Sequence, residues 1–316
     1  MKALIGGIGG QDGGYLAQLL LAKGYDVWGT SRDAHGARFS NLARLQIADR
    51  VQLISMDPVD FRSVLMALQR SEADEVYFLA GQSSVASSFE QPAEAMQSIV
   101  MGTLNMLESC RMMDRPVRLY CAGSSECFGN THGAPANETT PFSPRSPYAV
   151  GKASAYWLVD NYREAYKLHA CTGILFNHES PLRPERFVTK KIVSAAKRIA
   201  AGSQEKLIVG RLDIARDWGW APEYVDAMWR MLQQSTPRDY VIATGETHTL
   251  EQFVVEVFSA LDLDWRRYVE QDDKLFRPTD LHISRANPAE ASRSLGWQAK
   301  FHMREVIRGM LESDDT

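Results

Sequence analysis

The residues with the most direct chemical meaning in this sequence are Tyr148 and Lys152, in the segment YAVGK. They lie one helical turn apart in a stretch whose pattern predicts a helix from Tyr148 to Leu168, so both side chains should share one helix face. A lysine ammonium beside a phenol stabilises the phenolate and so lowers the pKa of the tyrosine. Such a tyrosine can take the proton of a substrate hydroxyl while a hydride leaves the carbon. The same pair also occurs by chance in helices, so the interpretation depends on the residues around it.

Ser124 and Glu126 supply that support, in the segment AGSSECFG directly after an apolar run that predicts a strand over 117–121. The Ser124 hydroxyl can hydrogen-bond the same substrate hydroxyl as the tyrosine. A glutamate in this place is often a surface or capping residue. Because it follows the strand that carries Ser124, we expect Glu126 to face the same pocket.

A glycine-rich turn near the N-terminus predicts a dinucleotide site. Gly7, Gly10 and Gly13 are spaced G-x-x-G-x-x-G, after an apolar strand and at the start of a helix, with Gln11 and Asp12 inside the motif. Glycines allow a tight turn and a close approach of the backbone to a pyrophosphate, which the N–H groups of the helix N-terminus can bind. We therefore expect this turn to hold a nicotinamide cofactor.

The end of the second expected strand distinguishes NADP from NAD. Arg32 follows that strand and Arg38 lies in the next loop, which favours the 2′-phosphate of NADP. Asp33 is evidence for NAD instead, since a carboxylate near this position would bind the ribose hydroxyl of NAD. Asp57, after the third apolar run, either bonds the adenine amino group or caps the next helix. We expect NADP, with NAD as the alternative.

Apolar runs alternate with amphipathic stretches through the first half of the chain, which predicts βαβ units and a parallel sheet covered by helices on both faces. The expected strands cover 3–5, 26–28, 51–54, 75–79, 117–121 and 172–176, and the expected helices cover 15–23, 63–71, 98–114 and 148–168. After about residue 180 helices dominate, at 189–201, 222–234, 249–261 and 288–295. We expect an α/β protein with a Rossmann-type, doubly wound parallel sheet over residues 1–180, to which some later strands and helices return. Residues 181–316 should form a smaller, mixed but mostly helical substrate lobe, and the polar residues from Glu312 to Thr316 should fray.

Composition excludes several classes of function. The chain has 35 basic and 39 acidic residues, a net charge of −4, which argues against nucleic acid as the main partner. No stretch approaches the ~18 apolar residues needed to span a membrane, and the N-terminus lacks a secretory pattern. The four cysteines have no metal-ligand spacing. We expect a cytoplasmic protein without a metal.

In the glycine turn, Ser124, Tyr148 and Lys152, the chain resembles the extended short-chain dehydrogenase/reductase superfamily. Within that superfamily it resembles the GDP-mannose 4,6-dehydratase family. The matching segments are spread over nearly the whole chain and read GIGGQDG, LAGQSSVASSFEQP, SSECFG, TPFSPRSPYAVGK, TGILFNHESP, FVTKKI, RDWG, YVIATG and LGW. The resemblance implies a Rossmann domain with a substrate lobe. It also implies a reaction in which sugar C4 is oxidised transiently, the C5 proton is removed, water leaves from C6 and the hydride returns to C6.

The resemblance assigns roles to individual residues. It implies that Tyr148 is the oxidation base, Lys152 its electrostatic partner and Glu126 the base for the C5 proton. Ser124 stands where the family usually has threonine, which is a mild change. The residues that the resemblance places around the GDP-sugar, or in segments that border it, are Ser83, Ser88, Asn177, Ser180, Val188, Lys191, Arg211, Arg216, Arg277 and Asp280.

Three residues of the substrate lobe depart from the family pattern: Arg211 replaces an asparagine, Asp280 a glutamate and Pro184 a glycine. They leave open a GDP-manno-heptose in place of GDP-mannose. A 4-keto-sugar reductase or C4-epimerase on the same scaffold is a second alternative, against which Glu126 argues, and a non-enzymatic NADP-sensing protein is a third. The resemblance also implies a homodimer or homotetramer, in which the loop from Ser31 to Arg44 could reach a neighbouring subunit's cofactor site.

Overall fold

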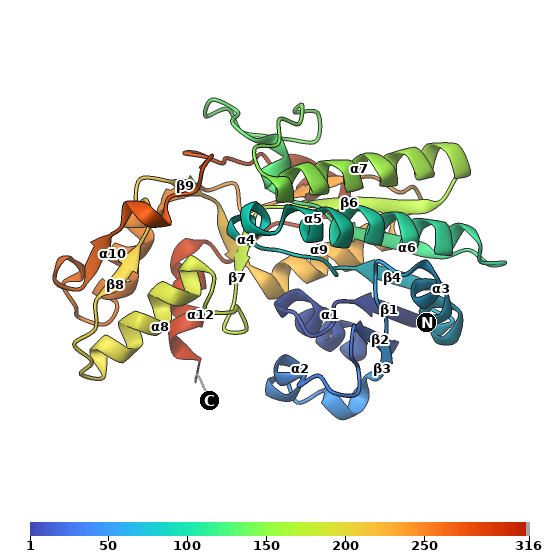
Figure 1. Cartoon of the computed structure of the whole chain (residues 1–316), viewed down its shortest axis with the longest axis horizontal. Helices are drawn as coiled ribbons and strands as arrows, with labels where there is room; N and C mark the ends of the chain where they lie inside the picture. Colours follow the sequence, from blue (N-terminus) through green and yellow to red (C-terminus); the bar gives the residue numbers. More distant parts are fainter. Residues whose placement is uncertain (314–316) are drawn as a thin grey trace.

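A seven-stranded parallel sheet forms the centre of the computed structural model, which describes residues 1–313 (Figure 1). The strand order is β11-β6-β5-β4-β1-β2-β3, and every neighbouring pair is parallel. The order reverses between β1 and β4, and ligands of such sheets bind at the carboxyl ends of the strands beside this point. The strands are β1 (Lys2–Gly6), β2 (Asp26–Ser31), β3 (Gln52–Ser55), β4 (Glu75–Phe78), β5 (Arg118–Ala122), β6 (His169–Leu175) and β11 (Tyr240–Ile242).

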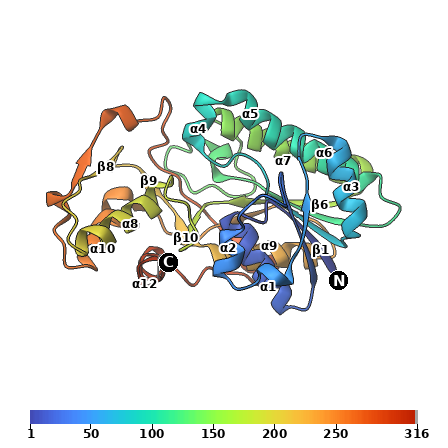
Figure 2. The same cartoon turned by 60° about the horizontal axis from the view of Figure 1, so that its bottom comes forward.

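Helices cover both faces of this sheet, because successive side chains of a strand point to opposite sides. On β1, Ala3 and Ile5 belong to the apolar cluster of one face, whereas Leu4 belongs to the cluster of the other. The first face carries α1 (Gln11–Ala22) and α9 (Ala221–Gln233), and the second carries α3 (Phe61–Ser71), α6 (Gly102–Arg111) and α7 (Pro147–Tyr166). Figure 2 shows α1 and α9 on the opposite side of the sheet from α6 and α7. The predicted α/β, doubly wound architecture is therefore confirmed.

Several helices differ from those that the sequence predicts. The predicted helix over 98–114 is the second part of a longer one, in which α5 (Pro92–Met96) passes through a π-helical turn (Gln97–Met101) into α6. Two more helices lacked a clear pattern in the sequence, α2 (Ser40–Arg44) and α4 (Val85–Glu90).

The smaller lobe has its own apolar core around Phe253, Phe258 and Val306. Its elements are β7 (Asn177–Glu179), β8 (Leu207–Val209), β9 (Ala215–Arg216), β10 (Trp218–Trp220), β12 (His248–Thr249), β13 (Val269–Gln271), α8 (Val188–Ala200), α10 (Leu250–Ser259) and α12 (Met303–Glu312). The strands pair two by two, β10 with β7, β12 with β9 and β13 with β8. We expected fraying from Glu312 onwards, but Glu312 ends α12 and Ser313 is its C-cap, bonded to Met310 O at 3.1 Å. Residues 314–316, the rest of that prediction, lie outside the described residues.

The chain crosses between the two parts more than once. After β10, helix α9 packs on α1, and β11 then pairs with β6 as the edge strand of the main sheet. α11 (Ala289–Leu295) also packs against β11 and α9 before α12 re-enters the smaller lobe. Returning segments of this kind hold the lobe against the carboxyl ends of the sheet.

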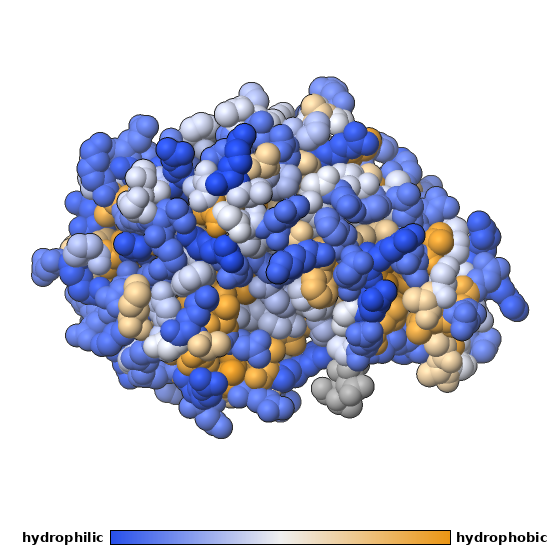
Figure 3. All heavy atoms as spheres, turned by 180° about the vertical axis from the view of Figure 1, so that it is seen from behind, coloured by the Kyte–Doolittle hydropathy of each residue, from blue (hydrophilic) through white to orange (hydrophobic). Residues whose placement is uncertain are grey.

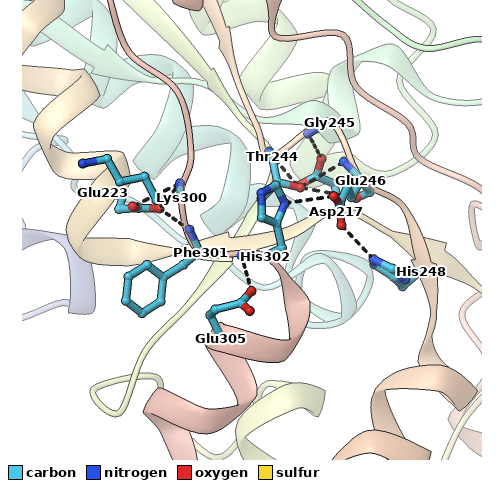
Figure 4. Close-up of polar contacts among 10 residues, drawn as sticks. All are labelled: Asp217, Glu223, Thr244, Gly245, Glu246, His248, Lys300, Phe301, His302 and Glu305. Atoms are coloured by element: carbon cyan, nitrogen blue, oxygen red, sulfur yellow. Dashed lines mark hydrogen bonds and ion pairs between the residues drawn. The ribbon is translucent and has the colours of Figure 1, made fainter.

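A buried carboxyl anchors one of these crossings (Figure 4). Asp217, between β9 and β10, accepts hydrogen bonds from Thr244 N at 3.0 Å and Gly245 N at 2.7 Å, just after β11. Burial raises the pKa of Asp217 to about 6, although these backbone donors oppose the rise. Beside it, the side chain of His302 lies 3.4 Å from the Glu246 carboxylate. The segment that contains Arg216 and Asp217 is thereby tied to the main sheet.

The exposed face in Figure 3 is covered mostly by hydrophilic residues, with hydrophobic ones between them. Within residues 1–313, no helix is long and apolar enough to cross a bilayer. The same residues contain no group of three or more His, Cys, Asp or Glu side chains arranged to hold a metal ion.

We predict that Asp239 stabilises the attachment of β11 more than any exposed ion pair does. Its carboxylate accepts from Arg163 of α7, at 2.7 and 2.9 Å, and from Thr172 N of β6 at 2.6 Å. Because a pair with little solvent access is expensive to break, Asp239→Asn should lower the free energy of unfolding by about 3 kcal/mol in urea titration. Asp160→Asn, which removes the more exposed partner of the same arginine, should cost at most about 1 kcal/mol. Equal losses in the two variants would contradict this account.

Candidate active site

The glycine turn has the geometry expected of a pyrophosphate cradle. Gly7 has φ of +83°, and a Cβ on Gly13 would lie 2.5 Å from Gly7 O, closer than any side chain tolerates. The first turn of α1 is therefore pressed against the end of β1. Gly10 occupies the N-cap and provides no side-chain cap, which leaves the first N–H groups of α1 for an anion. Gly7, Gly10 and Gly13 thus fit the backbone of a dinucleotide site.

Ser124 and Glu126 lie where the main sheet meets the smaller lobe. β5 ends at Ala122, and a 3₁₀ turn (Ser125–Phe128) follows, with Ser124 at its N-cap. The Ser124 hydroxyl accepts from Glu126 N at 3.3 Å, which sets the direction of this turn. Both side chains line one cavity of about 390 Å³, and Glu126 is half-buried there.

Tyr148 and Lys152 line the same cavity from the first turns of α7. Ser146 caps this helix by accepting from Ala149 N at 3.1 Å, and Pro147 begins it, so the sequence SPY fixes where the tyrosine emerges. Lys152 Nζ donates to Ala122 O at 2.7 Å and lies 5.9 Å from the centre of the Tyr148 ring. The lysine is thereby fixed between the tyrosine and the end of β5.

One electrostatic expectation is corrected by this geometry. We expected Lys152 to lower the pKa of Tyr148, but burial raises the Tyr148 pKa well above its usual value, and the adjacent Ser124 hydroxyl only partly opposes the rise. Burial likewise lowers the pKa of Lys152. Burial therefore outweighs the stabilisation of the phenolate that we expected from the ammonium.

The smaller lobe provides the opposite wall of the cavity, with Asn177, Val188 and Lys191, and Ser83 lines it from the loop after β4. Lys191 Nζ donates to Ile208 O at 2.6 Å, which holds the ammonium across the gap between α8 and β8. These four predicted substrate residues are brought together with Ser124, Glu126, Tyr148 and Lys152.

A pair of arginines shares one carboxylate at the end of this wall. Arg216 Nη2 lies 3.5 Å and Arg277 Nη1 3.9 Å from Asp280 Oδ1. Arg216 is 5% exposed, and burial lowers its pKa while the nearby carboxylates of Glu126 and Asp280 oppose the decrease. Glu126 therefore lies within electrostatic reach of a buried guanidinium. Arg277 lines the cavity itself.

Five predicted substrate residues do not line the cavity: Arg216 and Asp280, described above, and Ser88, Ser180 and Arg211. Ser88 is fully buried in α4 and donates to Val85 O at 2.7 Å. Ser180 is also fully buried, and it donates to Gln11 Oε1 at 2.8 Å, beneath the glycine turn. Arg211 is bound to Asp213 at 2.6 and 2.9 Å and lines a separate hollow that contains Phe276.

The remaining cofactor candidates lie near the end of the second strand. Arg32 and Arg38 are both exposed after β2. Asp33 accepts from His35 N and Gly36 N at 3.1 and 2.8 Å, so its carboxylate is used within its own loop. Asp57 accepts from Val59 N at 3.0 Å in a local turn, and the cap of α3 is Asp60 instead. Gln11 and Asp12 are both bonded to β7, as described below.

Sequence reasoning missed a group of cavity residues that follow Asn177. They share one short segment and are His178, Glu179, Arg183, Arg186 and Phe187. Arg183 lies 3.7 Å over the Phe187 ring and 3.1 Å from Glu179, whose carboxylate also accepts from Thr189. The available signal was the cluster of basic residues between 183 and 191.

Comparison with known proteins agrees with this arrangement. The family model described as GDP-mannose 4,6 dehydratase matches residues 4–310. GDP-mannose 4,6 dehydratase 2 of Arabidopsis thaliana is 45% identical, with 99% of this chain and 86% of the relative covered. GDP-mannose 4,6-dehydratase of Sinorhizobium fredii is 41% identical over 99% of this chain and 96% of the relative.

Among solved structures, UDP-glucose 4-epimerase of Thermus thermophilus in complex with NAD superposes with a TM-score of 0.85. The two chains are 26% identical, and the match covers 99% of this chain and 100% of the epimerase. The fold is thus that of the extended short-chain dehydrogenases. The match to the family model and the identity to its curated members show that this chain belongs to the GDP-mannose 4,6-dehydratase family.

Proposed function

We propose that this enzyme converts GDP-mannose to the GDP-4-keto-6-deoxy sugar. The observation that carries the proposal is the position of Glu126, which lines one cavity with Ser124, Tyr148 and Lys152. A simple reductase or epimerase needs the tyrosine and lysine to transfer a hydride, whereas loss of water from C6 also needs a base for the C5 proton. The family membership supports the same conclusion.

A nicotinamide cofactor fits the residues present. Gly7 and Gly13 form a cradle that a Cβ at either position would fill, at the N-terminus of α1 and the carboxyl end of β1. The chemistry supplied there by the bound nicotinamide is the temporary storage of one hydride, taken from sugar C4 and given back to C6. There is no net change in oxidation state, because substrate and product differ by one water.

The residues of the chain move the protons. Tyr148 takes the proton of the C4 hydroxyl as the ketone forms, with Ser124 donating to the same oxygen and Lys152 stabilising the phenolate. The new ketone makes the C5 proton acidic, and Glu126 removes it. The same carboxyl then protonates the departing C6 oxygen, so that water leaves and Glu126 is ionised again. As C6 receives the hydride, C5 takes up a solvent proton and Tyr148 releases the proton that it took from the C4 hydroxyl, so the proton count closes.

Cations on the smaller lobe are placed to hold the diphosphate. Lys191 and Arg277 line the cavity, and the buried Arg216 shares Asp280 with Arg277. Charge-assisted hydrogen bonds from such groups are about twice as strong as neutral ones. Asn177 and Val188 contribute a polar and an apolar contact on the same wall. We propose that Asp280, shared by the two arginines, orients them instead of contacting the ribose directly.

The other substrates are less well supported. A GDP-manno-heptose was kept open by Arg211, Asp280 and Pro184, but Arg211 is bound to Asp213 outside the main cavity. The relatives reported above are named for GDP-mannose. A reductase or epimerase leaves Glu126 without a role.

We propose NADP as the cofactor. Arg32 and Arg38 are exposed beyond the end of β2, where a 2′-phosphate would lie. Asp33, the residue that would favour NAD, is occupied by two backbone donors of its own loop.

Assembly into a homodimer or homotetramer remains our proposal, as does the cytoplasm as the compartment. Val150 and Trp157, two turns apart on α7, are 40% and 57% exposed, and Met101 beside them is 42% exposed. Such an apolar stripe is suited to a second copy of the chain. The exposed loop from Ser31 to Arg44 could then reach a neighbouring cofactor.

We predict that Glu126→Gln lowers the turnover of GDP-mannose by about 10²- to 10⁴-fold, because the amide cannot accept the C5 proton. Mass spectrometry of the nucleotide sugar would measure the loss of one water. Glu185→Gln, an exposed glutamate paired with Arg198, is the matched control and should keep full activity. Full turnover in the Glu126 variant would disprove the dehydratase assignment.

Arg32→Ala should weaken NADP binding by about 10-fold or more and leave NAD binding unchanged, since a hydrogen bond to a charged group contributes roughly 1.5–3 kcal/mol. Fluorescence titration with both cofactors measures the ratio. Arg70→Ala, at the exposed end of α3, is the control. Parallel losses for the two cofactors would show that Arg32 does not read the 2′-phosphate.

Light scattering should give a mass of at least twice that of one chain. Trp157→Glu should shift this mass towards that of the monomer, because the substitution places a charge in the apolar stripe. A monomeric wild-type protein, with or without NADP, would rule out the proposed assembly.

A further inference from the structure

His178 of β7 lies beneath the first turn of α1, with both ring nitrogens close to acceptors. Nδ1 is 2.8 Å from Phe176 O, and Nε2 is 2.9 Å from Asp12 Oδ2. A backbone carbonyl and an ionised carboxylate can only accept hydrogen bonds, so each nitrogen must carry a hydrogen. His178 can satisfy both contacts only as an imidazolium. The residue is nevertheless only 7% exposed.

The groups around the ring agree with this protonation. Burial acts to lower the pKa of His178, and Arg183 acts in the same direction, but the Asp12 carboxylate outweighs them and the pKa is raised. Burial acts to raise the pKa of Asp12, and His178 reverses this, with help from Gln11 and Arg183, and lowers it to about 2. Tyr224 of α9 covers the ring face at 4.5 Å between centres.

The contact extends to the rest of the first turn. Gln11 Nε2 donates to Asp12 Oδ1 at 3.0 Å and to His178 O at 3.2 Å. Ser180 Oγ donates to Gln11 Oε1 at 2.8 Å. The two polar side chains that follow Gly10 are thus bonded to β7 and the residues after it. Asn177, the neighbour of His178, lines the sugar cavity.

We propose that His178 is a positioning residue, a buried imidazolium that holds the first turn of α1 to β7 through Asp12 and so couples cofactor binding to the shape of the sugar site. This inference rests on the proposed function for its effect on the sugar. The ion pair is neutral as a whole, so it supplies rigidity without competing for the cofactor phosphates.

The direct test is nitrogen NMR of histidine in the unmutated protein. At pH 6.5 the signals of His178, assigned by their loss in His178→Gln, should show a ring that is mostly protonated on both nitrogens. In Asp12→Asn, with the carboxylate removed, they should become those of a neutral ring. A single neutral tautomer in the wild type at this pH would overturn the proposal, and this measurement does not depend on turnover.

The functional test is the affinity for the cofactor. His178→Gln keeps one hydrogen bond and loses the charge, and should weaken NADP binding by about 10- to 100-fold and raise KM for GDP-mannose more than it lowers kcat. His248→Gln, in β12, is the matched control and should behave as the wild type. NADP affinity and KM both within twofold of the wild type in the His178 variant would contradict the coupling.

The pH dependence adds a readout that a purely structural histidine would lack. Because the folded-state pKa of His178 is raised above 6.5, its contribution is fully present below pH 6.5 and is lost as the pH rises through the folded value. NADP affinity of the wild type should therefore decline on the alkaline side, and His178→Gln should lack that decline. Cofactor binding without GDP-mannose turnover would refute the proposed substrate and leave the role of His178 intact.

Discussion

The close approach of α1 to the end of β1 is the constraint on which the rest of the site depends. A Cβ on Gly13 would overlap Gly7 O, so only glycine allows the helix to begin where it does. This position aims the free N–H groups of the first turn at a pyrophosphate and brings Gln11 and Asp12 against β7. Since β7 continues into the wall of the substrate cavity, one backbone contact determines the geometry of both ligand sites.

The hydride-transfer residues depend on a second set of fixed backbone groups. Lys152 is held by the carbonyl of Ala122, the last residue of β5, and Tyr148 emerges at the capped start of α7. Burial raises the pKa of Tyr148, so the phenolate of the proposed mechanism depends on the Ser124 hydroxyl and on the Lys152 ammonium held beside the ring.

Much of the fold could be predicted because its signals are local. The alternation of apolar runs and helices predicts the parallel sheet, and the glycine spacing predicts the first βα turn. Helix α12 was missed although Met303, Val306, Ile307 and Met310 repeat with helical spacing, because these residues are mixed with charged ones. The return of β11 to the sheet rests on long-range contacts such as Arg163 with Asp239, which no local pattern contains.

The site shows the same division. The grouping of Ser124, Glu126, Tyr148 and Lys152 in one cavity could be predicted because each follows the end of a strand or the start of a helix. Ser88 and Ser180 were placed at the sugar from motif position alone, but their hydroxyls are bonded within the protein. His178 was missed because its partner, Asp12, is 166 residues away in the chain.

The most direct test of the central claim follows one labelled hydrogen. GDP-mannose with deuterium at C4 would be incubated with the enzyme in ordinary water, and the product analysed by mass spectrometry and NMR. The account predicts a product lighter by one water, with the deuterium moved to C6 and a solvent proton at C5. Deuterium retained at C4, or a product that has lost no water, would contradict it.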